Sequence, residues 1–301
     1  MSTLPPEFFR FLERAETVLA RVESLLPPPP RAINWEAHAY RWRRQRAGTQ
    51  RQGYLEAVLH PHRIRAEDLC GIEDQLQRID LNTRQFVAGR SANNVLLTGA
   101  RGTGKSSLVK AMLDRYGKQG LRLIEVDKDD LVDLPDIVDL IAGRSERYII
   151  FSDDLSFEAG EASYKALKSI LDGSIAGTPQ NVLIYATSNR RHLMPEFMSE
   201  NLETRVENGE IRPGDTTEEK VSLSERFGLW ISFYPFDQDK YLEICAHWLA
   251  AFGVSTAQID AARTEALQWS LLRGARSGRV AWQFARDYAG RLDAGHNGAA
   301  S

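Results

Sequence analysis

Short apolar runs and helical repeats alternate through the middle of this chain. From about residue 60, runs rich in β-branched and other apolar residues are separated by stretches with apolar residues at helical spacing. The runs predict strands at 95–98, 121–126, 148–151, 182–186 and 230–233. The stretches between them predict helices, for example at 105–116 and 162–171. This alternation indicates an α/β fold with a parallel five-stranded sheet and helices on both faces.

Both ends of the chain show helical spacing instead. Near the N-terminus, apolar residues from Phe8 to Val22 recur on one helix face, and the prolines at 27–30 end the pattern. After Pro235, residues 238–252, 256–272 and 277–292 predict three helices of a separate all-helical lid domain. We therefore expect an N-terminal helix with a proline linker (1–30), an arm (31–59), an α/β domain (60–236), a lid (237–293) and a flexible tail (294–301).

Composition narrows the class of protein. The 301 residues are 43% hydrophobic and 26% charged, which is typical of a soluble globular protein. The formal net charge of −3 gives no chain-wide attraction to nucleic acid or to an anionic membrane. Cys70 and Cys245 lie far apart without metal-ligand spacing, so we expect two core thiols rather than a disulfide or a zinc site. With no secretory signal and no apolar run of spanning length, we expect a cytoplasmic protein without a membrane partner.

One segment, from Arg31 to Tyr54, is strongly basic. Aromatic residues are interleaved with its arginines, and Glu36 is its single acidic residue. The arginines are Arg31, Arg41, Arg43, Arg44, Arg46 and Arg51, and the aromatic residues are Trp35, Tyr40, Trp42 and Tyr54. Such a segment fits a protein-docking or intersubunit arm. It also fits a nucleic-acid contact, in which arginines bind phosphates and aromatic rings stack on bases. The third alternative is a solvated helix face.

Residues 199–220 are polar, acidic and without periodicity, and predict a long surface loop that orders on a partner.

A phosphate-binding loop follows the first predicted strand. The residues Gly99, Ala100, Arg101, Gly102, Thr103, Gly104, Lys105 and Ser106 match G-x-x-x-x-G-K-[ST], and a predicted helix follows them directly. The glycines allow the N–H groups from Gly102 to Ser107 to point at phosphates at a helix N-terminus. Lys105 supplies a charge for the β- and γ-phosphates, and the Ser106 hydroxyl is a hard ligand for Mg²⁺. The motif predicts ATP and Mg²⁺ as cofactors.

Two carboxylates end the strand predicted at 148–151. Asp153 is placed to hold Mg²⁺ through water, and Asp154 to orient or deprotonate the attacking water. Many ATPases have a glutamate where this chain has Asp154, and an aspartate is one methylene shorter. The attacking water is then less well placed, so slow hydrolysis is expected. Helix capping is the alternative for these acids. For a second acidic cluster, Asp127 to Asp130, we favour a turn with a helix cap over the guanine-selecting motif of GTPases.

Further motifs resemble those of the AAA+ superfamily of P-loop ATPases, from about residue 60 to residue 292. Asn189, after the strand at 182–186, resembles sensor 1, and Ser224-Glu225-Arg226-Phe227 resembles the box whose arginine reaches the neighbouring subunit's nucleotide. Asp68-Leu69-Cys70-Gly71-Ile72 resembles the segment that packs on adenine, which implies Leu69 and Ile72 at the base. Gly274-Ala275-Arg276-Ser277-Gly278-Arg279 resembles sensor 2, with Arg276 the better match and Arg279 the alternative.

The whole pattern is similar to a bacterial family of AAA+ proteins of unknown cellular role. The resemblance implies the strand order 5-1-4-3-2, a ring or filament of identical subunits, and catalysis by Asp154, Asn189 and, in trans, Arg226. Phosphate contacts would come from the loop residues Gly99, Arg101, Gly102, Thr103, Gly104, Lys105, Ser106 and Ser107, and the metal from Ser106 and Asp153.

Three functions compete at this stage. The leading hypothesis is an oligomeric, Mg-dependent ATPase that remodels or loads a macromolecular partner, most simply another protein. A nucleotide-gated binding module with little or no turnover is the second hypothesis, because Asp154 replaces the usual glutamate. A small-molecule kinase is the third, but it leaves Asn189, Arg226 and the Gly-Ala-Arg sequence at 274–276 unexplained.

Overall fold

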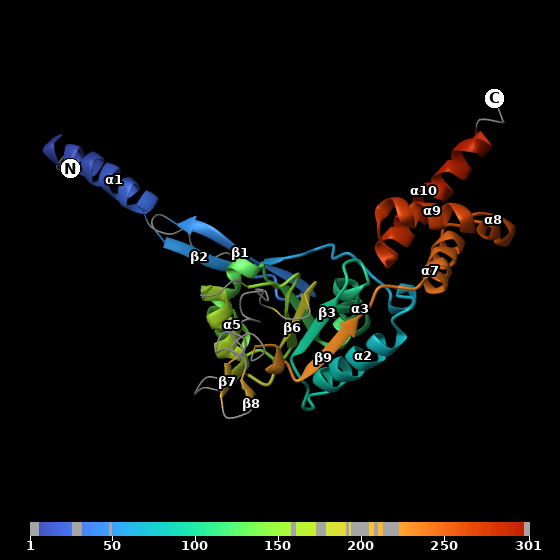
Figure 1. Ribbon diagram of the computed structural model, residues 1–301. Helices are drawn as coiled ribbons and strands as arrows, with labels where there is room; N and C mark the ends of the chain where they lie inside the picture. The colour runs from blue at the N-terminus through green and yellow to red at the C-terminus, as the bar shows by residue number, and fades with distance from the viewer. Residues whose placement is uncertain are drawn as a thin grey trace.

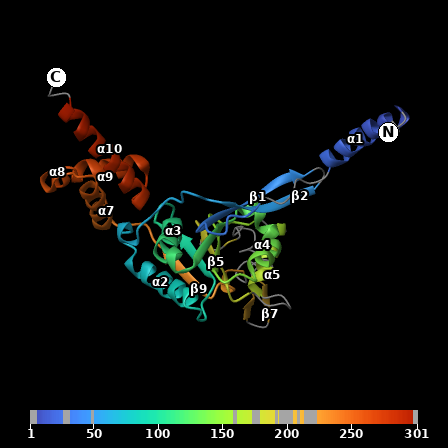
Figure 2. The ribbon, with the colours of Figure 1, turned by 180° about the vertical axis from the view of Figure 1, so that it is seen from behind.

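The fold is taken from a computed structural model, which describes residues 6–25, 32–47, 50–157, 161–172, 179–190, 193, 205–207, 210–212 and 223–297. A sheet domain lies at the centre, and a helical lid and a projecting N-terminal helix lie on opposite sides of it (Figure 1). Figure 2 shows the same arrangement from behind.

The central sheet has the strand order β2-β1-β4-β5-β6-β3-β9. Its strands are β1 (Ala39–Ala47), β2 (Gln50–Ala57), β3 (Val95–Gly99), β4 (Leu121–Glu125), β5 (Arg147–Ser152), β6 (Val182–Ser188) and β9 (Leu229–Phe233). The five expected strands are β3, β4, β5, β6 and β9, which pair in parallel. Numbered along the chain they give the order 5-1-4-3-2. The parallel α/β sheet is the one that the sequence pattern predicted, and its strand order is the one that the resemblance to AAA+ proteins implied.

Two strands that the sequence did not predict extend this sheet. β1 and β2 form an antiparallel hairpin, and β1 pairs in parallel with β4. We expected the basic segment at 31–59 to form an arm separate from the α/β domain, and this expectation was wrong. It continues the sheet of that domain. Tyr40 and Trp42 are almost fully buried, so two of the four aromatic residues that suggested base stacking belong to the core.

Ion pairs explain why an arginine-rich strand joins the sheet. Arg41 donates to Glu125 of β4 at 2.6 Å, and Arg44 donates to Asp133 at 2.6 Å. The Trp42 indole N–H also donates to Asp133, at 2.9 Å, and Arg44 pairs with Asp130 at 3.2 Å. The acids following β4 thus hold the hairpin. Asp127 makes no side-chain capping bond to the helix after it, which corrects the prediction of a helix cap there.

Helices cover both faces of the sheet. The helices α2 (Glu73–Val87) and α3 (Lys105–Tyr116) pack on one face, and α4 (Leu134–Ile141) and α5 (Ala162–Asp172) on the other. Successive strand residues alternate between the two cores: Leu96 belongs to one, and Val95 and Leu97 to the other. Three short 3-10 turns complete the domain, at Ala66–Asp68, Gly117–Gln119 and Lys128–Asp133.

The lid has its own core. Its helices are α7 (Gln238–Ala251), α8 (Thr256–Ala261), α9 (Arg263–Arg273) and α10 (Gly278–Asn297). Tyr241, Cys245 and Phe284 are among its buried residues. The helix predicted at 256–272 is broken at Ala262, which is 1% exposed in this core, so that both halves can pack against it. α10 continues to Asn297, beyond the predicted end at 292 and into the expected tail.

The remaining described element at the N-terminus is α1 (Pro6–Leu25), at the place where the sequence predicts a helix. The proline linker at 27–30 lies outside the described residues, as does most of the predicted loop at 199–220. Within that loop β7 (Arg205–Glu207) and β8 (Glu210–Arg212) form a small hairpin. Among the described helices, none is both long and apolar enough to cross a bilayer.

Candidate nucleotide-binding site

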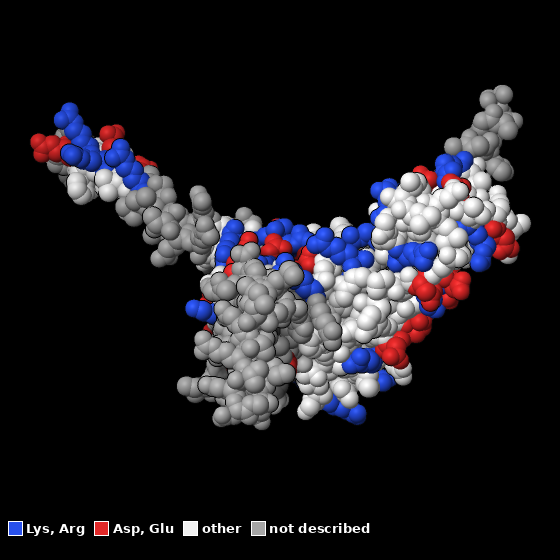
Figure 3. Space-filling view, viewed as in Figure 1, with Lys and Arg blue, Asp and Glu red and all other residues white. Residues whose placement is uncertain are grey.

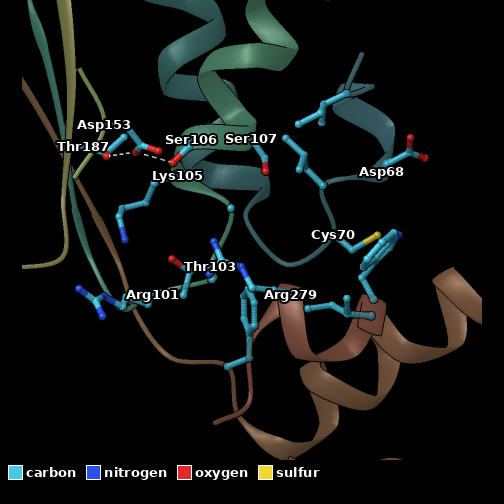
Figure 4. Close-up of a pocket in the computed structure, with 18 of the residues that line it drawn as sticks. Asp68, Cys70, Arg101, Thr103, Lys105, Ser106, Ser107, Asp153, Thr187 and Arg279 are labelled. Carbon is cyan, nitrogen blue, oxygen red and sulfur yellow. Dashed lines mark hydrogen bonds between the residues drawn. The ribbon is translucent and has the colours of Figure 1, made fainter. Parts of the chain in front are cut away.

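A pocket of about 720 Å³ lies between the carboxyl ends of the parallel strands and the lid. This volume is in the range of sites that hold a cofactor. The phosphate loop, the ends of β5 and β6, the segment before α2 and the first turn of α10 all line it (Figure 4). Both domains therefore contribute to one site.

Glycine geometry shapes the phosphate loop. Gly99 and Gly104 have φ angles of 126° and 101°, which residues with a side chain rarely adopt. A Cβ at Gly99 would also lie 1.9 Å from the carbonyl oxygen of Phe233 in β9. The loop ends where α3 begins at Lys105, so its N–H groups and the helix dipole face the pocket.

Lys105 reaches across the loop toward β6. Its ammonium donates to the carbonyl oxygens of Gly99 and Ala100 at 2.8 Å and to Asn189 Oδ1 at 3.0 Å. Burial lowers the pKa of Lys105, and the nearby carboxylates of Asp153 and Asp154 oppose that shift. An anionic phosphate in the pocket would favour the charged form further. Lys105 and Asn189 thus lie in hydrogen-bond contact at the phosphate end of the pocket.

Ser106 and Asp153 meet at the start of α3. The Ser106 hydroxyl donates to Asp153 Oδ1 at 2.6 Å, and the Thr187 hydroxyl donates to the same oxygen (Figure 4). A serine hydroxyl and a carboxylate are hard oxygen ligands that fit Mg²⁺, which in nucleotide sites takes its other ligands from phosphate and water. Within the described part of the chain there is no group of three or more His, Cys, Asp or Glu side chains that could hold a metal ion. The donor set therefore fits a metal that arrives with a nucleotide.

Asp154 has an unusual backbone conformation. Its φ of +55° makes it the one described non-glycine residue with a positive φ. Its N–H donates to the Thr187 hydroxyl at 2.8 Å, and its carboxylate accepts from Asn189 and lies 3.6 Å from Arg101. The carboxylate is thus held at the edge of the pocket by Asn189 and Arg101.

The far end of the pocket is apolar and aromatic. It is lined by Leu69, Cys70, Phe236, Ile244, Trp248 and Trp282. Ile72 does not line the pocket; it packs beneath the loop, where a Cβ at Gly104 would lie 3.2 Å from its side chain. Cys70, which we expected in a core, is half-buried in this wall, and burial raises the pKa of its thiol. Cys245 is buried in the lid as expected.

The lid supplies one of the two candidate arginines. Arg279 lines the pocket, and its backbone N–H donates to the Gly102 carbonyl oxygen at 3.2 Å. Arg276 is not among the lining residues, although its motif match is better. It lies before α10, and its carbonyl oxygen accepts from the Phe236 N–H. The first turn of α10 therefore brings Arg279, not Arg276, to the phosphate loop.

Arg226 lies away from this pocket. It directly precedes β9, an outer strand of the sheet, whereas the phosphate loop follows the opposite end of the neighbouring parallel strand β3. Its guanidinium donates to Asp172 at the end of α5. Arg226 thus faces a different edge of the domain from its own nucleotide site.

Sequence reasoning missed several lining residues. Thr187 stands in the segment singled out for Asn189, and its place at the end of β6 beside β5 could have suggested a contact with Asp153. Trp248 and Trp282 carry no motif; they follow helical spacing like ordinary lid residues. Only the packing of the lid on the α/β domain brings them to the pocket.

Comparison with known proteins gives one family match. A family model described as "Protein of unknown function (DUF815)" matches residues 35–292. No curated protein matches the chain significantly.

Solved structures with a similar fold include a RuvB variant from Thermotoga maritima, with 17% identity over 74% of this chain and a TM-score of 0.46. This chain spans 63% of that protein's length. A second is the "RuvB Holliday junction branch migration motor" of T. maritima, with 16% identity over 76% of this chain and 72% of that one and a TM-score of 0.40. A third is a chain of the E. coli HORMA:CdnC:Trip13 complex, with 11% identity over 73% of this chain and 89% of that one and a TM-score of 0.45.

Proposed function

The chain belongs to the DUF815 family, and we propose that it is a Mg-dependent ATPase that works as an oligomer and remodels or loads another protein. The observation that supports this best is the single pocket into which the α/β domain places Lys105, Asp153 and Asn189 and the lid places Arg279. A pocket closed by two domains can couple the state of a nucleotide to their relative position.

We assign the roles in the reaction from this geometry. The phosphate loop and Lys105 bind the phosphates, while Ser106 and Asp153 would hold Mg²⁺, which would offset negative charge on the nucleotide's phosphates. Asp154 orients or deprotonates the attacking water, and Asn189 fixes Asp154 through a hydrogen bond. Arg226, distant from its own pocket, acts on the nucleotide of a neighbouring subunit.

We propose a protein partner rather than nucleic acid. The described arginines of the basic segment bind acids of their own chain: Arg41 binds Glu125, Arg43 binds Glu56, and Arg44 binds Asp130 and Asp133. Charges neutralised in this way contribute little to phosphate binding. The side chains of Arg31, Arg46 and Arg51 lie outside the described residues.

The first test removes the phosphate-binding charge. We expect Lys105→Ala to weaken ATP binding about tenfold or more, because a lost charged contact typically costs ~2 kcal/mol. Isothermal titration calorimetry with ATP and Mg²⁺ measures this directly. Lys110→Ala, on the same helix but away from the pocket lining, is the matched control. Equal affinity in both variants would refute the phosphate-loop assignment.

A second test separates the two lid arginines. We expect Arg279→Ala to raise the dissociation constant of ATP about tenfold, for the same loss of a charged contact, and Arg276→Ala to change it little. Calorimetry on the two variants, with thermal melting to verify that the lid stays folded, gives the comparison. The reverse ranking would return the sensor 2 role to Arg276.

A nucleotide-gated module with little turnover is the second candidate function. The observation that favours it is the environment of Asp154, whose carboxylate is held by Asn189 and lies near Arg101. A carboxylate already held by other side chains is less free to contact the attacking water. Steady-state phosphate release by the assembled protein decides between the candidates, since a gated module would bind ATP but release almost no phosphate.

A further inference from the structure

The N-terminal helix α1 carries large apolar side chains that belong to none of the cores formed by the described residues. Phe8, Phe9, Phe11, Leu12, Val18 and Leu19 are 42–67% exposed. The helix projects from the sheet domain on the side opposite the lid (Figure 1). Burial of such side chains favours association, and helices in water depend on burial of an apolar face for most of their stability. An exposed apolar face of this size marks a binding surface.

The spacing on this face is that of a coiled coil. Phe8, Leu12, Ala15 and Leu19 follow one another at intervals of four, three and four residues, which is the a/d repeat of a heptad with Leu12 and Leu19 at a. Phe11 and Val18 occupy the adjoining g position and widen the stripe. A repeat of 3.5 residues keeps one face in register with another helix, so the surface fits a helical partner.

Charges on the two borders of the stripe decide which helix fits. Glu16, at e, borders one side, and Arg14 and Arg21, at c next to g, border the other. In a parallel pair of identical helices the e side of one faces the g side of the other, so acid meets base at both borders. In an antiparallel pair the acidic borders face each other. Glu7, in the first turn, is the exception and suits the helix N-terminus.

The polar face does not suit a membrane surface. Helices that lie on anionic membranes have polar faces rich in Lys and Arg. On α1 the bases Arg10, Arg14 and Arg21 are accompanied by acids. Figure 3 shows both signs of charge along the helix.

We propose that α1 is an assembly helix, which associates in parallel with α1 of a second copy of this chain. Rotation about an axis that runs along the helices leaves all α1 helices pointing the same way, as parallel pairing requires. This inference rests on the proposed function, because an Arg226 that acts in trans needs a neighbour. Pairing of α1 raises the local concentration of that neighbour.

The test measures assembly of the full chain without reference to turnover. We expect the double variant Leu12→Glu, Leu19→Glu to raise the dissociation constant of the oligomer about tenfold or more by sedimentation velocity. The control is Arg10→Gln, Thr17→Glu, which makes the same change in net charge at the f positions opposite the stripe. Its assembly should match that of the wild type.

Charge exchange tests the parallel arrangement. Glu23 shares position e with Glu16, so Glu16→Arg, Glu23→Arg makes both borders mainly basic, whereas Arg14→Glu, Arg21→Glu makes both acidic. Each variant alone should therefore assemble less than the wild type at low salt. An equimolar mixture should recover assembly, because every border then meets its opposite.

Three outcomes would overturn the inference: a wild type that stays monomeric with ATP and Mg²⁺, a Leu12→Glu, Leu19→Glu variant that assembles like the wild type, or a mixture that assembles no better than its components. Binding of wild type but not this variant to phosphatidylserine vesicles, without self-association, would assign α1 to membranes instead. Absence of ATPase activity with normal, α1-dependent assembly would refute the proposed function and leave the assembly helix standing.

Discussion

Replacing Arg226 with alanine should reduce ATP hydrolysis about 10³-fold while leaving ATP binding nearly unchanged, because arginine fingers stabilise charge on the γ-phosphoryl oxygens of the transition state. The structure places Arg226 before β9, at the end of the sheet opposite the phosphate loop. Calorimetry reports on binding, and phosphate release at several protein concentrations reports on turnover. Turnover of the wild type should rise more steeply than linearly with protein concentration.

Two controls separate the guanidinium from its surroundings. Asp172→Ala removes the ion pair that Arg226 makes within its own chain but keeps the guanidinium, so hydrolysis should persist. Glu225→Ala changes the exposed neighbour and should have little effect.

Mixing tests catalysis between subunits. An Arg226→Ala subunit has an intact pocket, and a Lys105→Ala subunit has an intact finger, so a mixture can build a complete site at one interface. Partial recovery of hydrolysis on mixing is the expected result. Full activity of Arg226→Ala alone at every concentration would show that Arg226 is a structural residue paired with Asp172.

The sheet was predictable where its strands are buried on both faces. β3, β5 and β6 are mostly apolar and almost fully buried, a pattern that arises because helices cover both faces, while β4 and β9 keep enough apolar residues to be recognised. β1 was not predictable in this way: its sequence, Ala-Tyr-Arg-Trp-Arg-Arg-Gln-Arg-Ala, is dominated by arginines. The acids that neutralise them, such as Glu125 and Asp133, lie some ninety residues away, and only the folded chain brings them together.

The site was predictable where backbone and chemistry constrain a short motif. The phosphate loop, Asp153 and Asn189 occupy fixed positions at strand ends, and the structure brings all of them to one pocket. Choosing between Arg276 and Arg279 was a different problem, because it depends on where α10 begins relative to Gly102. A motif fixes the neighbourhood of such a residue but not the helix face from which its side chain points.

The backbone at residue 154 suggests why aspartate stands where glutamate is common. A φ of +55° is left-handed, and among non-glycine residues Asn and Asp adopt this region most readily. Glutamate there would carry strain on the order of 1–2 kcal/mol. The short carboxylate is therefore matched to its backbone, and Asp154→Glu is expected to lower stability rather than to improve hydrolysis.

Asp154→Asn should abolish most hydrolysis while retaining ATP. Asparagine accepts the left-handed conformation and keeps the shape of the side chain, but it cannot take a proton from water. Loss of a general base typically costs 10²–10⁴-fold in rate, so phosphate release should fall by roughly that factor, with the ATP dissociation constant changed little. Asn189→Ala, which removes the hydrogen bond that orients Asp154 but leaves the carboxylate, should cause a smaller loss.

An Asp154→Asn variant that hydrolyses ATP at the wild-type rate would mean that Asp154 is not the base. A wild type that already releases no phosphate when assembled would instead favour the nucleotide-gated module. If turnover does depend on Asp154, the ATP-locked Asp154→Asn protein is the form in which to capture the partner, because the complex that hydrolysis normally releases would persist.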